Sequence, residues 1–156
     1  GYYPDMQRCT CTSAAINRYL RKISRPLLDR IDICVEVPPI GFKDLYNTGK
    51  SERSEEIRKR VIRTQEIQKM RYCGEEFCFN SHIPSSKIFE YCKLDKKQET
   101  YMERMYNKLN LTARTYHKIL RVARTLADME ESEQIKMRHL NEAICYRNID
   151  KKFWEV

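Results

Sequence analysis

Residues 111–130 read LTARTYHKILRVARTLADME, and apolar residues recur in them at intervals of three and four. That spacing places the apolar side chains on one face of an α-helix. Thr112 is suited to cap the N-terminus of this helix, and Leu111 and Tyr116 have the spacing of a hydrophobic staple. The stretch therefore predicts a strongly amphipathic helix that ends near Met129 and needs other helices to cover its apolar face. That face consists of Ile119, Leu120, Ala123, Leu126 and Ala127.

Helical signals continue on both sides of this stretch. Ser51 or Ser54 can cap one helix, and Asp95 with Gln98 forms a capping-box pattern for another. Short amphipathic helices joined by short loops, roughly four or five of them, are typical of a helical bundle. The helices are predicted over residues 51–71, 85–92, 95–109 and 137–146. The first of them has an apolar stripe of Ile57, Val61, Thr64, Ile67 and Met70.

A different pattern precedes the loop at 41–50. Thr12 or Ser13 can cap a short helix that reaches about Ile23, after which residues 24–26 stop it. A strand with one buried face is then predicted from period-two alternation. Its apolar members are Ile31, Ile33, Val35 and Val37. Because a single strand cannot satisfy its own backbone hydrogen bonds, we expect it to pair with strands that this sequence does not contain.

Composition limits the class of protein. The chain has 156 residues, 33% of them charged and 41% hydrophobic, with a net charge of +8 at pH 7. No apolar run is long enough to span a bilayer, and the N-terminal residues lack the pattern of a signal peptide. The seven cysteines are an odd number without regular spacing, which favours reduced thiols or a metal site over disulfides. We therefore expect a soluble cytoplasmic protein without a membrane partner, whose positive charge permits nucleic-acid binding.

Three segments together resemble the magnesium-chelatase-like AAA+ family, in particular its competence-associated branch of branch-migration helicases. Residues 1–12, GYYPDMQRCTCT, resemble the end of a cysteine-rich stretch of that family. Residues 24–38, SRPLLDRIDICVEVP, resemble the end of the ATPase core. Residues 111–130 resemble the sensor-2 helix of the lid domain that follows the core.

The resemblance implies a mainly α fold, in which an AAA+ lid bundle follows a truncated remnant of the α/β core with one strand. Residues 1–40 would end the core, 41–50 would be a linker, and 51–150 would form the lid. It further implies a ring-forming ATPase, expected to be a hexamer, whose lid contacts its own core and sister subunits and couples ATP and Mg²⁺ chemistry to DNA remodelling or translocation. The sequence has no phosphate-binding G-x-x-x-x-G-K-[ST] loop, so this chain alone should not hydrolyse ATP.

Two arginines receive roles from the resemblance. Arg30 resembles the arginine finger, which stabilises charge on ATP bound by the next subunit; the alternative is a surface arginine paired with Asp29 or Asp32. Arg114 resembles the sensor-2 arginine, which contacts the nucleotide phosphates of its own or a neighbouring subunit; the alternative is an exposed helix arginine. Arg25 stands where relatives tend to have glycine and adds a second basic group beside Arg30.

The cysteines offer two metal hypotheses. Cys9 and Cys11 could supply two thiolates to a tetrahedral Zn²⁺, with upstream cysteines as the other pair by resemblance; the alternative is a pair of free thiols. A second ligand set follows from the residues alone, although irregular sets of this kind are rarer than ordinary loop cysteines. It consists of Cys73, Cys78, His82 and Cys92.

Two other functions remain open. A free-standing basic helical module could bind nucleic acid or another protein without any role for ATP, and Arg30 would then be dispensable. Steep salt dependence of DNA binding would favour that function, because phosphate contacts release counterions. A chelatase subunit that drives metal insertion into a porphyrin would share the ATPase parts, but the cysteine-rich opening favours the DNA-linked branch.

Overall fold

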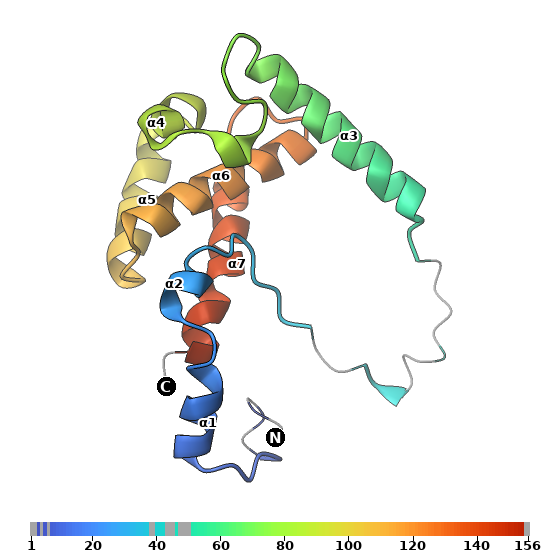
Figure 1. Cartoon of the computed structure of the whole chain (residues 1–156). Coiled ribbons are helices and arrows are strands. Elements are labelled where there is room, and N and C mark those ends of the chain that lie inside the picture. The colour runs from blue at the N-terminus through green and yellow to red at the C-terminus, as the bar shows by residue number, and fades with distance from the viewer. Residues whose placement is uncertain are drawn as a thin grey trace.

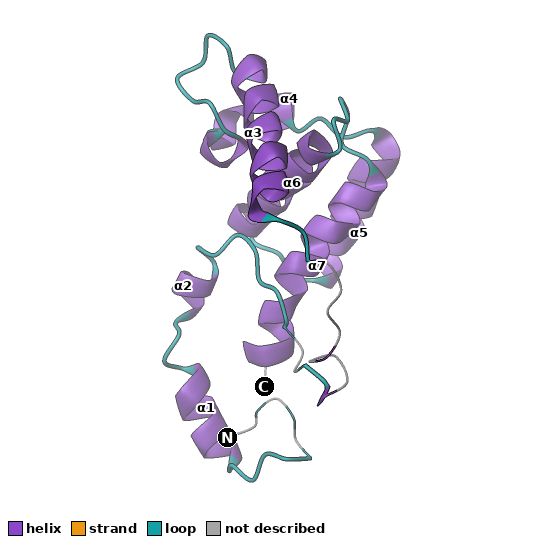
Figure 2. Cartoon of the chain, turned by 90° about the vertical axis from the view of Figure 1, so that its right-hand side faces the viewer, coloured by secondary structure: helices purple, strands orange, loops and turns teal. Residues whose placement is uncertain are grey.

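The computed structural model describes residues 3, 5, 7–37, 40–42, 46 and 51–154, apart from the side chains of residue 25 and residues 148–154. This part of the chain is mainly helical, and no strand occurs in it (Figures 1 and 2). The α-helices are α1 (Ser13–Leu20), α2 (Arg25–Leu28), α3 (Ser54–Arg71), α4 (Ile88–Tyr91), α5 (Lys96–Lys108), α6 (Ala113–Met129) and α7 (Met137–Trp154). The 3₁₀ turns are η2 (Asn80–His82) and η3 (Ser85–Lys87). The predicted mainly α fold is confirmed.

Helix α6 occupies the centre of the bundle and contacts α3, α4 and α7 (Figure 1). Its predicted apolar face is confirmed, since Ile119, Leu120 and Ala123 are fully buried. The predicted cap is also present, because the backbone N–H of Thr115 donates to Thr112 Oγ1 at 3.1 Å. The Thr112 cap fixes where α6 begins, and the buried apolar face fixes the rotation of α6 about its axis. That rotation determines which of its polar side chains face outward.

Helix α5 begins at the predicted capping box. Gln98 N donates to Asp95 Oδ1 at 2.8 Å, and Asp95 N donates to Gln98 Oε1 at 2.9 Å. The side chain of Gln98 also donates to the carbonyl of Ile135 at 2.8 Å, which joins the start of α5 to the segment that leads into α7. Met102 of α5 and Leu140 of α7 are fully buried in the shared core.

Helix α3 differs from its prediction in two ways. It begins at Ser54, and its N-cap residue Arg53 makes no side-chain capping bond, so the predicted serine cap is wrong. The apolar members of the predicted stripe are largely exposed, with Ile57 44% and Met70 66% accessible. The buried residues of α3 are polar: Thr64, which belongs to the predicted stripe, and Gln68, which does not. The reason is that α3 meets α6 only through its C-terminal half, and its N-terminal half points away from the bundle (Figure 1).

The N-terminal region supplies α1, α2 and an extended segment. Thr12 caps α1 as predicted, accepting from Ala15 N at 3.3 Å. Pro26 lies in the first turn of α2, where proline is tolerated, so the predicted stop at 24–26 is the start of a second short helix.

The strand predicted over 31–37 is not formed. These residues are coil, and the backbone N–H of Cys34 donates to Tyr146 O of α7 at 3.0 Å. Val35 and Val37 are 63% and 82% exposed. The alternation of side chains is present in the sequence, but no other extended segment of the described chain lies beside it to form a ladder.

Across the described residues, no helix combines the length and the apolar character that crossing a membrane requires.

Candidate functional site

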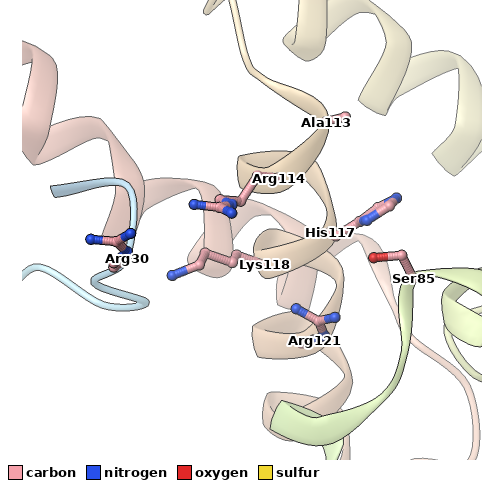
Figure 3. A pocket seen from close by; sticks show the side chains of 7 residues that line it. All are labelled: Arg30, Ser85, Ala113, Arg114, His117, Lys118 and Arg121. Atoms are coloured by element: carbon pink, nitrogen blue, oxygen red, sulfur yellow. The ribbon is translucent and has the colours of Figure 1, made fainter. Parts of the chain in front are cut away.

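An open pocket of about 460 Å³ lies between the first half of α6, the turn after α2 and the start of η3 (Figure 3). The structure places both arginines singled out in the sequence, Arg30 and Arg114, in its lining. Their side chains come from different elements and approach the same space, with Lys118 beside them (Figure 3). The complete lining is Arg30, Ser85, Ala113, Arg114, His117, Lys118 and Arg121.

Arg30 is exposed in the turn that follows α2, and its acidic neighbours are engaged by other cations. Asp32 Oδ1 lies 2.7 Å from Lys118 Nζ of α6. Asp29 Oδ1 lies 3.9 Å from Arg147 Nη2 of α7. In the described part of the chain, the Arg30 guanidinium has neither an ion pair nor a hydrogen bond. The alternative of a surface arginine paired with Asp29 or Asp32 is therefore not what the structure contains.

Helix α6 presents three of its cations along one face. Arg114, Lys118 and Arg121 are spaced by four and three residues, which places them on adjacent turns of the same face. Arg114 lies in the first turn, where the helix dipole is positive and backbone N–H groups lack intrahelical partners. Like Arg30, it has no ion pair with any residue that the structure describes. The N-terminal end of α6 therefore favours an anion.

Arg121 is held at the inner wall of the pocket. Its Nη2 donates to the carbonyl of Ile83 at 2.6 Å, and its Nε is buried without a hydrogen-bond partner among the described residues. Arg124, one turn further along, is different: it is buried and donates to Asp128 Oδ1 at 3.1 Å and to Glu133 O at 2.8 Å. Arg124 is thus part of the core, whereas Arg121 belongs to the pocket.

Sequence reasoning missed Lys118 and Arg121 as site residues. The signal was available, since both fall on the same helix face as Arg114, but solvated cations on helix surfaces are common and the spacing alone selects none of them. What distinguishes these two is the fold around them. Lys118 is nearly buried, with 11% of its side chain exposed, and faces the turn that carries Arg30.

The charged residues that line the pocket are all basic. Its lining contains three arginines and a lysine and no carboxylate, although Asp32 contacts the lysine from outside the lining. Burial first, and the charge of Arg121 second, lower the pKa of His117, which favours its neutral imidazole. Such a lining can bind and polarise an anion with several oxygen atoms, because guanidinium groups match the geometry of phosphate oxygens. It offers no carboxylate for general base catalysis or for Mg²⁺.

The cysteine hypotheses have a different outcome. Cys9 is half-buried and Cys11 is exposed. No three His, Cys, Asp or Glu side chains of the described chain come together to hold a metal, so the ligand set at residues 73–92 does not assemble. Burial raises the pKa of the Cys92 thiol to about 12, as expected for a cysteine of the core. The Cys9–Cys11 half-site, which requires ligands outside this chain, stays a prediction.

Comparison with known proteins gives two family matches. Residues 51–147 match "Magnesium chelatase, subunit ChlI C-terminal", and residues 1–45 match "Magnesium chelatase, subunit ChlI". Among curated proteins, competence protein ComM of Haemophilus influenzae is 42% identical over 148 residues, which is 94% of this chain and 28% of that protein. The uncharacterized proteins YifB of Salmonella typhimurium and Escherichia coli are 36% and 34% identical over 143 residues, or 90% of this chain and 27% of each. The chain thus spans little more than a quarter of the length of these relatives.

Proposed function

The chain belongs to the magnesium-chelatase family, and we propose that it forms the lid and the adjoining edge of the core in a ring-forming AAA+ ATPase. In this proposal, Arg30 and Arg114 contact the phosphates of an ATP molecule bound by the neighbouring subunit. The observation that carries it is the pocket that gathers both arginines, neither of which is ion-paired within the described chain.

The charge of the pocket supports a polyanionic ligand. Arg30, Arg114 and Arg121 repel one another across a space that no carboxylate lines. An anion with several charged oxygens removes that repulsion and can contact more than one guanidinium at once. A triphosphate has this chemistry, and the open first turn of α6 adds backbone N–H groups to it.

The shared pocket also bears on whether Arg114 contacts the ATP of its own subunit or the ATP of the neighbouring subunit. Arg30 acts between subunits if it is an arginine finger. Because Arg114 lines the same pocket of about 460 Å³, a single triphosphate can contact both side chains. We therefore assign Arg114 to the neighbouring subunit's nucleotide as well.

The two arginines would have different tasks. Arg30 places a permanent positive charge where negative charge develops during phosphoryl transfer, and such groups contribute about 10³-fold or more in rate. Arg114, fixed to the first turn of α6, links the position of the lid to the presence of phosphates. Mg²⁺ would be held by the subunit that binds the nucleotide, because no carboxylate lines this pocket.

The output of this ATPase is proposed from the family branch. Relatives of this chain include a protein named for competence, and the resemblance described above implies DNA remodelling or translocation by a ring, expected to be a hexamer. Zn²⁺ bound by Cys9 and Cys11 together with cysteines outside the chain belongs to the same proposal.

Subunit complementation in the full-length protein tests the proposal. One variant carries Arg30→Ala, and the other has an inactivated phosphate-binding loop but an intact Arg30. Each is expected to lack ATP turnover, and mixing them should restore it, because a mixed interface combines an intact ATP site with an intact arginine. The same pairing is made with Arg114→Ala. Mixed rings without turnover would indicate that the arginines act on their own subunit's ATP. Normal turnover by the Arg30→Ala protein would refute the arginine-finger role of Arg30.

A further inference from the structure

The turn that carries Arg30 is attached to the lid helices on both sides. On one side, Arg147 of α7 donates from Nη1 to the carbonyls of Ile31 at 2.5 Å and Leu28 at 3.4 Å, and its Nη2 lies 3.9 Å from Asp29 Oδ1. The side chain of Arg147 is nearly buried, with 5% of it exposed. A buried side chain that contacts three of the four residues 28–31 restricts the backbone of that turn.

The second attachment comes from α6. Lys118 Nζ lies 2.7 Å from Asp32 Oδ1, and the lysine side chain is largely buried while the aspartate is mostly exposed. Just beyond it, the backbone N–H of Cys34 donates to Tyr146 O of α7 at 3.0 Å. Residues 28–34 are therefore held by α6 and α7 together, although no sheet in the described chain supports them.

Both attachments also occupy the carboxylates that could capture Arg30. Asp29 and Asp32 are the nearest acids to Arg30 in sequence, at positions one and two residues away. If either were released, it could pair with the exposed guanidinium and cancel its charge. The ion pairs to Lys118 and Arg147 thus restrict the turn and keep Arg30 available for an external anion.

We propose that Lys118 and Arg147 are positioning residues that latch the Arg30 turn onto helices α6 and α7, so that Arg30 and Arg114 meet one phosphate ligand as a single unit. This inference rests on the proposed function for its consequence in ATP turnover, but the latch itself is a property of this chain. The lid would set the position of Arg30, because the groups that hold the Arg30 turn lie on the lid helices α6 and α7.

The latch is tested first by amide exchange in this chain. Lys118→Ala and Asp32→Asn should each raise the exchange rate of the Cys34 amide by about two- to fivefold, the factor that corresponds to a partly exposed ion pair. Arg147→Ala should raise it by about tenfold or more, because the carbonyls of Leu28 and Ile31 lose a buried charged donor. Exchange in the centre of α6 should stay unchanged. Arg58→Glu, an exposed change on α3, is the control, and the charge swap Asp32→Lys with Lys118→Asp should restore protection.

ATP turnover of the full-length protein then separates positioning from simple charge. Asp32→Asn makes the surroundings of the pocket more positive, so a role through charge alone predicts tighter ATP binding and normal or raised turnover. The latch predicts reduced turnover for both Asp32→Asn and Lys118→Ala.

Three outcomes have distinct meanings. Unchanged Cys34 exchange in the Lys118→Ala and Asp32→Asn proteins overturns the latch, whatever the ATPase activity. Faster exchange with wild-type turnover, while Arg30→Ala remains inactive, overturns positioning and leaves the proposed function intact. If circular dichroism shows that the Arg147→Ala protein does not fold, the Asp32→Asn and Lys118→Ala proteins still test the latch.

Discussion

Asp128 is the residue whose loss should cost the most stability. It is 1% exposed near the end of α6 and accepts hydrogen bonds from three side chains. Arg71 Nη1 donates to it at 2.8 Å, Asn80 Nδ2 at 2.8 Å and Arg124 Nε at 3.1 Å. These donors come from α3, η2 and α6, so Asp128 is the point at which the three elements are joined.

Asp128→Ala removes the carboxylate that two guanidinium groups and an amide share, and leaves them only neutral acceptors such as Thr125 Oγ1 and the carbonyl of Glu133. Removing one partner of a buried charged network costs about 3–5 kcal/mol, because the remaining charge stays buried and uncompensated. Arg71 retains 21% exposure of its side chain and can reach water, so we expect a value near the lower end, about 3 kcal/mol. That loss corresponds to a decrease in Tm on the order of 10 °C.

Urea unfolding followed by circular dichroism measures the free energy of unfolding. Asp128→Asn keeps the shape and part of the acceptor capacity, so its cost should be smaller than that of Asp128→Ala. Glu131→Ala is the matched control: Glu131 pairs with Arg63 of α3 at 3.2 Å, but both side chains are more than half exposed, and its loss should change stability little. A cost below about 1 kcal/mol for Asp128→Ala would refute the argument that this network joins α3 to the bundle.

Further predictions concern the core and the helix caps. Because burial raises the pKa of Cys92 to about 12, stability should be intact below the unfolded thiol pKa and should fall as pH rises from there toward 12; Cys92→Ala should lose this dependence in urea melts across that range. Iodoacetamide should modify the exposed Cys73 in the native protein and Cys92 only after unfolding, which peptide mass spectrometry detects. Asp95→Ala should cost about 1 kcal/mol in urea unfolding because it removes the cap of α5, whereas Ser54→Ala should have almost no effect because Ser54 makes no capping bond. Ile119→Ala should cost about 2–5 kcal/mol in the same assay because it opens a cavity in the core.

The bundle could be predicted from sequence because its signals are local. Thr112 and Asp95 each lie within three residues of the groups they cap, and the apolar face of α6 repeats along a single helix. Neither signal depends on what packs nearby.

The predictions that were wrong depended on absent or distant partners. Alternation in 31–37 predicts a strand, yet a strand exists only where another one pairs with it, and the described chain has none. The apolar stripe of α3 suggested a buried face, but this helix is joined to the bundle through Gln68 and Arg71, which bond to Asn80 and Asp128. A polar network of this kind is assembled from residues far apart in sequence, so periodicity cannot reveal it.

Only some of the charged residues of the pocket could be predicted from the sequence, because the others depend on contacts between distant segments. Arg30 and Arg114 were identified through the resemblance, which assigns roles to motifs but says nothing of their distance. Lys118 and Arg121 carry no motif, and their importance depends on α6 lying against the Arg30 turn. Only the three-dimensional arrangement distinguishes them from the many solvated cations of this basic chain.

The ion pairs of Asp29 and Asp32 connect the exposure of Arg30 to the position of helices α6 and α7. In a turn with the sequence Asp-Arg-Ile-Asp, the simplest outcome is an arginine neutralised by its own neighbours. Here Lys118 and Arg147 bind those two aspartates, and the arginine remains exposed. Because the binding groups lie on α6 and α7, a rotation of these helices would displace Arg30 and Arg114 together. Under the proposed function, the lid would therefore engage or release both contacts to the neighbouring ATP in one movement, without a separate change in the core.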